Sequence, residues 1–175
     1  STDVLGATKM HDFDGITPTI ANVRPSSRGE VNIVSKDSRD NPKIKMNYLS
    51  TQDDRDIAAK ALKIVRNIML NSKTFKKYEP EEYRPGANIT ADEELVKAAS
   101  DHAQTIFHPV GTCKMGNDEN SVVSDELKVH GINNLRVIDA SVMPNITSGN
   151  TNAPTIMIAE KGADMILKGQ QWMNR

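Results

Sequence analysis

The stretch that most limits the fold is FHPVGTCKMGNDENSVV, residues 107–123. Proline lacks the N–H that a helix or an inner strand needs, and glycine weakens both structures. Pro109, Gly111 and Gly116 are spaced through the segment, which therefore predicts a loop rather than a helix or a long strand. Glycine also lets a backbone approach a neighbouring surface closely. His108 is a candidate for chemistry in this loop, although a lone loop histidine more often serves structure.

Regular elements are predicted on both sides of this loop. Apolar and polar residues alternate in RGEVNIVSKD and NPKIKMNYLS, which indicates two half-buried strands joined by a polar turn. Apolar residues three and four apart predict amphipathic helices over about 53–71 and 91–104. A short apolar strand is expected over 135–138. A last helix is expected to begin near Pro154 and to end at Gly169.

These elements predict an α+β fold. We expect an antiparallel sheet with helices on one side, followed by a C-terminal segment of strand, loop and helix.

A second polar loop, SGNTNAPT, precedes the last helix. Gly149 frees the backbone, and the carboxamides of Asn150 and Asn152 both donate and accept hydrogen bonds. The N–H groups at the start of the helix suit an anion, or negative charge that develops during a reaction. N-capping by Asn152 ahead of Pro154 explains the same residues without a ligand. The residues alone leave both interpretations open, and they do not establish that the two loops meet.

Composition excludes several classes of function. The chain has 22 Lys and Arg against 23 Asp and Glu, a net charge of -1, so no basic surface for nucleic acid is indicated. No apolar run approaches the roughly 20 residues of a membrane span. No set of His, Cys and acidic residues has metal-ligand spacing. Cys113 is the single cysteine, so no internal disulfide can form, and a cytoplasmic location is expected.

Three blocks of the chain resemble the C-terminal signature of the glucose–methanol–choline (GMC) flavoprotein oxidoreductases, especially the branch of choline dehydrogenases and related alcohol dehydrogenases. The blocks are HPVGTCKMG, SVVSDELKVHGINNLRVIDASVMP and SGNTNAPTIMIAEKGADMI, which follow in order within residues 105–168. A weaker resemblance extends back through SRGEVNIVSKDSRDNPKIKMNYLSTQDDRDIAAKALKIVRNI. Long blocks in the same order make the resemblance specific.

The resemblance implies an FAD-dependent enzyme that oxidises a primary alcohol, choline-like or other, by hydride transfer to flavin N5. His108 matches the family's active-site histidine, which would accept the hydroxyl proton. Asn150 matches the residue that would hold the alcohol oxygen. The positions that match cofactor-binding residues are Asp139, Ala140, Asn152, Pro154 and Thr155. For Asp139, a turn after the strand is the structural alternative.

The same resemblance predicts an incomplete site. The family carries an N-terminal dinucleotide-binding half with a Gly-rich fingerprint, and G-x-G-x-x-G occurs nowhere in these 175 residues. We therefore expect residues 1–132 to form part of a substrate-binding domain, and residues 133–175 to contribute to the FAD site of a longer enzyme. Alone, the chain is expected to be inactive, not to bind FAD tightly, and to self-associate through an apolar face that the missing half would cover.

Two alternative functions stay open. A hydroxynitrile lyase of the same fold would bind flavin without using its redox chemistry. A binding module would have kept the domain and lost catalysis. The sequence specifies neither the alcohol nor the electron acceptor.

Overall fold

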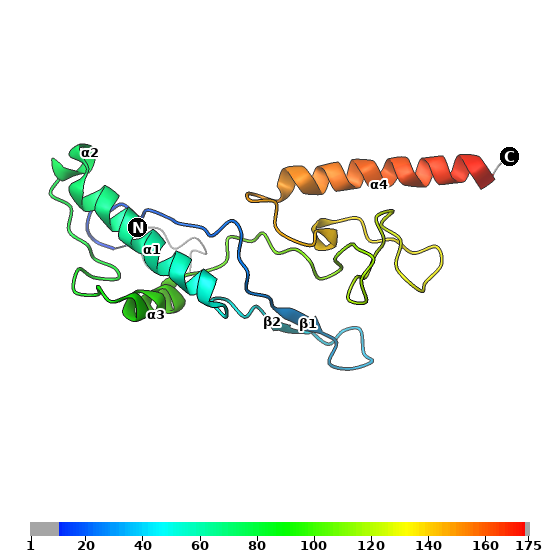
Figure 1. The fold of residues 1–175 in the computed structure, drawn as a ribbon, viewed down its shortest axis with the longest axis horizontal. Coiled ribbons are helices and arrows are strands. Elements are labelled where there is room, and N and C mark those ends of the chain that lie inside the picture. The colour runs from blue at the N-terminus through cyan, green and yellow to red at the C-terminus, as the bar shows by residue number, and fades with distance from the viewer. Residues whose placement is uncertain (1–10, 174–175) are drawn as a thin grey trace. The chain divides into compact units, whose positions relative to one another are not determined.

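The computed structural model describes residues 11–173, which form two compact units (Figure 1). The first unit comprises the described residues up to Asn22 together with Arg55–His102. The second comprises Val23–Asp54 together with the described residues from Ala103 onward. These units are defined by how compactly their residues pack. The predicted division into 1–132 and 133–175 instead separates a substrate-binding part from a part that contributes to the FAD site, and it stays a prediction.

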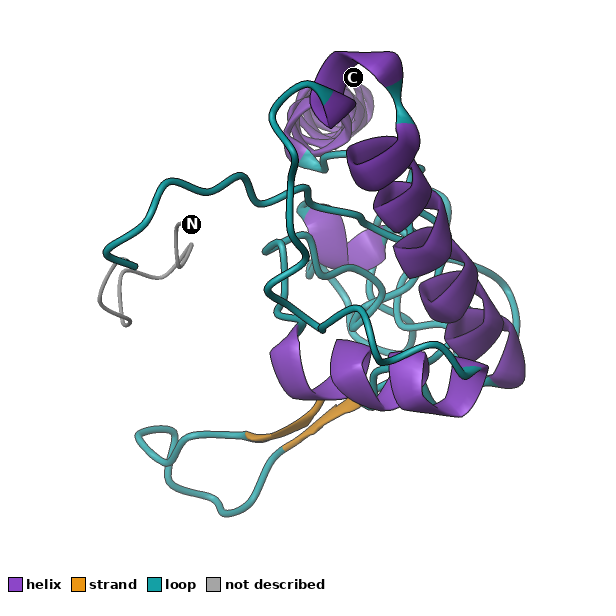
Figure 2. Cartoon of the chain, turned by 90° about the vertical axis from the view of Figure 1, so that its left-hand side faces the viewer, coloured by secondary structure: helices purple, strands orange, loops and turns teal. Residues whose placement is uncertain are grey.

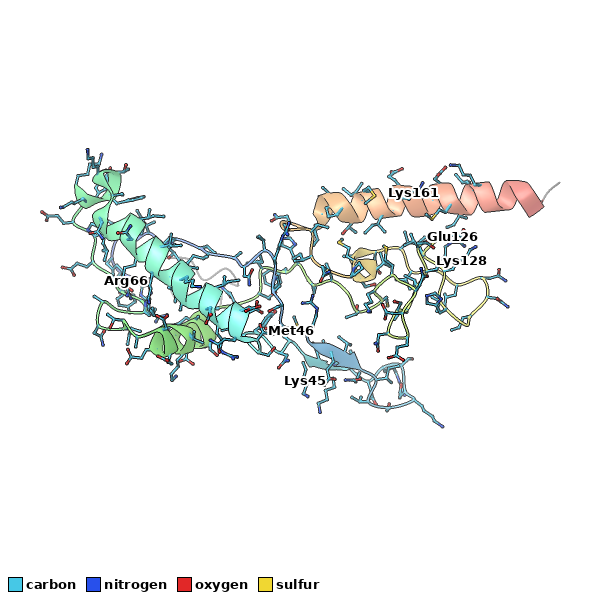
Figure 3. The ribbon with its side chains drawn as sticks, viewed as in Figure 1. Lys45, Met46, Arg66, Glu126, Lys128 and Lys161 are labelled. Carbon is cyan, nitrogen blue, oxygen red and sulfur yellow. The ribbon has the colours of Figure 1, made fainter. Side chains whose placement is uncertain are left out.

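The first unit is helical. It contains most of α1 (Gln52–Asn71), the one-turn α2 (Lys73–Lys76) and α3 (Asp92–His102). The periodicity placed the two longer helices to within two residues at each end. Ala59 of α1 and Leu95 of α3 are buried. Arg66, labelled on α1 in Figure 3, forms a bidentate ion pair with Glu82.

The second unit contains a small antiparallel sheet. Strands β1 (Glu30–Asn32) and β2 (Lys43–Lys45) pair with Val31 opposite Ile44. Figure 2 shows them in orange, joined by a long turn. The predicted hairpin is confirmed, but its half-burial is wrong, because Val31 is 48% and Ile44 59% exposed. All six strand residues are exposed. Strands of three residues offer few side chains for packing against another layer.

The strand expected over 135–138 is also wrong. It is reduced to a single bridge between Lys128 and Arg136. Asn134 has a φ of 62° just before it, and the short 3-10 helix η1 (Ala140–Val142), capped by Asp139, follows directly. A turn on one side and a capped helix on the other leave no length for a ladder.

An apolar core holds the loops of the second unit together. Val123 and Val142 are fully buried, and they cluster with Leu127, Met143 and Ile158. Ile158 belongs to the last helix, Val123 ends the first polar loop, and the other three come from the segment between the two polar loops. The core therefore fixes that irregular segment against the helix without a large sheet.

The last helix, α4 (Asn152–Met173), begins near the predicted position but runs past Gly169. Gly169 is exposed, and a glycine at such a position costs a helix only about 1 kcal/mol, too little to end it. Figure 1 shows η1 lying against α4. Within residues 11–173, no helix combines the length and the apolar content needed to cross a membrane.

Candidate functional site

His108 and Thr151 join the two polar loops of the second unit. Nδ1 of His108 lies 3.0 Å from Oγ1 of Thr151. The backbone nitrogen of Thr151 lies farther from the same nitrogen, at 3.5 Å. Thr151 is buried and His108 is half-buried. The question that the residues alone left open, whether these loops meet, is therefore answered: they do.

The loop that carries His108 lies close against the segment around η1. Gly111 has a φ of 89°, and a Cβ there would stand 3.4 Å from the carbonyl oxygen of Met143. The N–H of Cys113 donates to the carbonyl of Ser141 at 3.0 Å. The close approach that glycine permits is thus present. Phe107, with a φ of 64°, turns the chain into the loop in a conformation that costs a non-glycine residue of order 1 kcal/mol.

Thr151 is anchored by the first turn of α4. Its carbonyl accepts from the N–H of Thr155 at 3.0 Å and from the Thr155 hydroxyl at 2.6 Å. The Thr155 hydroxyl, matched by resemblance to a cofactor-binding position, therefore serves a backbone contact in this structure. Tying Thr151 to the helix also fixes the contact that it makes with His108.

Two arginines hold the loop that precedes α4. Nε of Arg24 donates to Oγ of Ser148 at 2.6 Å, and Nη2 of Arg28 donates to Oδ1 of Asn145 at 2.5 Å. Ser148 takes a φ of 60°. The backbone freedom expected of Gly149 is not needed, because Gly149 is not left-handed and a Cβ there would meet nothing within 4 Å.

Asn150 and Asn152 expose their side chains on either side of Thr151. Neither side chain hydrogen-bonds to another residue in the described part of the chain. The N-cap contact considered for Asn152 is therefore not formed. Both carboxamides are available to a ligand, and Asn150 directly precedes the residue that contacts His108.

Asp139 forms the turn that was its structural alternative. Its Oδ1 accepts hydrogen bonds from the N–H of Ser141 at 2.8 Å and from the Ser141 hydroxyl. Asp139 thereby caps the N-terminus of η1. Asp139 is exposed, and its neighbour Ala140 is half-buried against the core. A cofactor role for this pair stays a prediction.

Sequence reasoning missed Thr151, Arg24 and Arg28. Thr151 lies between two asparagines that were singled out, and its place just before a proline-containing helix start was a usable indication. The arginines gave no such indication, because their partners lie 124 and 117 residues away. Among the described residues, no three His, Cys, Asp or Glu side chains come together in a way that could hold a metal ion.

Comparison with known sequences places the chain in a family. Residues 25–159 match the sequence family described as GMC oxidoreductase. The chain belongs to this family. The oxygen-dependent choline dehydrogenases of Citrobacter koseri and Shigella flexneri are 48% and 46% identical to it over 91% and 97% of its length. The chain spans only 28% and 30% of the length of these two GMC relatives.

Solved GMC structures share the fold. The structure of an FAD-dependent oxidoreductase from Chaetomium thermophilum superposes with a TM-score of 0.80 and 34% sequence identity. The match covers 85% of this chain and 26% of the chain of that oxidoreductase. The structure of a fungal aryl-alcohol oxidase superposes with a TM-score of 0.74 and 30% sequence identity. The match covers 86% of this chain and 25% of the chain of that oxidase. The resemblance stated from the three sequence blocks is confirmed, as is a GMC domain with a small antiparallel sheet and helices.

Proposed function

We propose that this chain forms the alcohol-binding side of an FAD-dependent active site, in a longer enzyme that oxidises a primary alcohol. The contact between His108 and Thr151 carries the proposal, because it brings the loop of the active-site histidine beside Asn150. The names of the relatives, choline dehydrogenase and aryl-alcohol oxidase, agree with an alcohol as substrate. In this proposal residues 133–175 contribute to the FAD site, and a dinucleotide-binding half supplies the rest.

The residues around the start of α4 fit a flavin. The exposed carboxamides of Asn150 and Asn152 are unpartnered among the described residues. The free N–H groups in the first turn of a helix favour a neighbouring negative charge. FAD, when bound, supplies the acceptor for the hydride. The residues that we assign to holding it are Asp139, Ala140, Asn152, Pro154 and Thr155.

His108 and Asn150 act on the alcohol oxygen. Nδ1 of His108 is engaged by Thr151, whereas Nε2 has no partner within the described part of the chain. His108 therefore takes the hydroxyl proton at Nε2. The side-chain NH₂ of Asn150 donates to the same oxygen and fixes the orientation of the substrate. A positioned base of this kind contributes about 10²–10⁴ in rate.

Flavin reduction in the complete enzyme tests the proposal. The FAD-loaded enzyme is mixed anaerobically with a panel of primary alcohols, choline among them, and bleaching of the flavin absorbance is followed. Bleaching is expected, and His108→Ala should slow it by about 10²–10⁴-fold. Asn150→Ala should slow it too. His130→Ala is the matched control, because Nε2 of His130 lies 3.0 Å from the carbonyl oxygen of Gly116, in a local contact.

Two results would contradict the proposal. A His108→Ala enzyme that bleaches at the wild-type rate would remove the base. Cyanide release from a cyanohydrin, without bleaching by any alcohol, would identify the hydroxynitrile lyase alternative instead. Separately, a stoichiometric flavin spectrum from residues 1–175 alone would show that the FAD site is complete without a further half.

A further inference from the structure

Thr151 presents two different groups to the same nitrogen of His108. Its Oγ1 lies at 3.0 Å from Nδ1, an ordinary hydrogen-bond length, while its backbone nitrogen lies at 3.5 Å. A backbone N–H can only donate, whereas a hydroxyl can donate or accept. The hydroxyl contact is the shorter of the two and the only one whose direction can change.

The protonated ring requires an acceptor at Nδ1. An imidazole that has taken a proton at Nε2 carries N–H on both nitrogens. The N–H of Thr151 cannot accept the second of these, and Oγ1 of Thr151 is the acceptor within hydrogen-bonding distance in the described part of the chain. The hydroxyl is therefore the group that can stabilise the imidazolium formed when His108 removes a proton.

We propose that Thr151 is a positioning residue for His108: its Oγ1 accepts the Nδ1–H, which leaves the lone pair of the neutral ring on Nε2. The hydrogen bond made by one ring nitrogen sets which nitrogen holds the proton. This role rests on the proposed function of His108 as a base.

The surroundings of Thr151 make the contact rigid. Thr151 is only 8% exposed, and a β-branched side chain has few rotamers. Its carbonyl is held by Thr155 in the first turn of α4. The ring of His108 is thus tied to the start of a helix rather than to a mobile loop, and its Nε2 keeps a constant direction.

The opposite arrangement makes a different prediction. If both groups of Thr151 donated to Nδ1, the neutral ring would carry its proton on Nε2. His108 would then offer a donor to the alcohol oxygen and could not accept its proton. The two arrangements differ in which nitrogen is protonated, so they are separable without measuring activity.

Substitutions at Thr151 test the role in the complete, FAD-loaded enzyme. Thr151→Val keeps the buried shape and removes the hydroxyl, which leaves the N–H facing Nδ1 and favours a proton on Nε2. We expect flavin reduction to slow by about 10–100-fold, the range seen when partners that orient metal-ligating histidines are removed. Its pH profile should shift as well. Thr151→Ser should restore the rate and the profile. Thr147→Val, an exposed threonine in the same loop, should change neither.

Nitrogen-15 NMR of the same enzymes, labelled at histidine, reads the tautomer directly. The signal of His108 is assigned by its loss in His108→Gln. The wild type and Thr151→Ser should show a protonated Nδ1 and a bare Nε2 in the neutral ring, and Thr151→Val should show the reverse. A wild-type ring protonated on Nε2, or a tautomer unchanged in Thr151→Val, would overturn the inference.

The outcomes also separate this inference from the proposed function. If alcohols fail to bleach the wild-type flavin, the proposed function fails, and the NMR result still decides the tautomer. If His108→Ala stops bleaching while Thr151→Val bleaches at the wild-type rate with an unchanged tautomer, only the role of Thr151 fails.

Discussion

Gly162 lies so close to Ile138 that a Cβ on the glycine would stand 2.6 Å from Cγ2 and 2.9 Å from Cδ1 of the isoleucine. Gly162 is buried in the middle of α4. Ile138 belongs to the segment that was expected to be a strand and packs against the core instead. The absence of a side chain at Gly162 therefore lets the helix sit against that segment.

Gly162→Ala should destabilise the chain even though alanine is the better helix former. The clash should cost about 1–3 kcal/mol, against at most ~1 kcal/mol gained from helix propensity. Urea denaturation measures the difference. Gly169→Ala is the matched control in the same helix, where a Cβ would meet nothing within 4 Å, and it should stabilise by up to about 1 kcal/mol. Equal effects of the two substitutions would contradict the packing described here.

Local sequence patterns correctly predicted the elements whose structure depends mainly on residues close together in the chain. The helices α1 and α3 and the hairpin of β1 and β2 were placed correctly, because periodicity and turn composition are local properties. The end of α4 was placed wrongly, because a glycine ends a helix only where the residues after it adopt a non-helical conformation, and here the helix continues to Met173.

Tertiary contacts decided what the patterns could not. The half-burial expected of Val31 and Ile44 required a covering layer that local alternation does not reveal. The motif blocks pointed to His108 and Asn150, yet the contact that joins their loops is made by Thr151. No rule based on spacing relates residues 43 positions apart, so that contact became visible only in the structure.

Val142 tests the core that holds the two loops together. It is fully buried, and Val142→Ala should lower the free energy of unfolding by about 2 kcal/mol through lost burial and a cavity. Val34→Ala is the matched control in the same unit, because Val34 is 56% exposed, and it should have little effect. Chemical denaturation of both variants measures the difference. A Val142→Ala protein as stable as the control would show that this cluster is not a true core.

The ion pair between Arg66 and Glu82 should stabilise the first unit. Nε and Nη2 of Arg66 lie 2.7 and 2.9 Å from the two carboxylate oxygens, and the side chains are 19% and 12% exposed. Glu82→Gln removes the charge and one acceptor, so we expect a loss of about 1–3 kcal/mol. Hydrogen exchange of the α1 amides reports on this unit. Asp101→Asn, which removes an exposed pair with Lys97, should leave exchange unchanged, and equal effects would argue against a special role for Arg66.

Asp54 ties the start of α1 to the segment before β1. It is 4% exposed, and its two carboxylate oxygens accept from the N–H groups of Ser26 and Ser27 at 2.9 and 2.8 Å. Burial alone would raise the pKa of Asp54. The hydrogen bonds from the Ser27 side chain and from the backbone of Ser26 and Ser27 outweigh burial and hold the pKa below its ordinary value.

This lowered pKa makes stability depend on pH in a defined direction. A carboxyl with a lower pKa in the folded state stabilises the fold above its unfolded pKa, near 3.9 for aspartate, and loses that contribution as the pH falls through the folded pKa. Asp54→Asn should therefore cost about 1.5–3 kcal/mol at pH 7, and the difference from the wild type should shrink below about pH 4. Urea denaturation across this range measures it. Asp53→Asn, at the exposed neighbour, is the matched control and should have a smaller effect at pH 7. A constant difference between Asp54→Asn and the wild type at every pH would mean that the carboxylate charge plays no part.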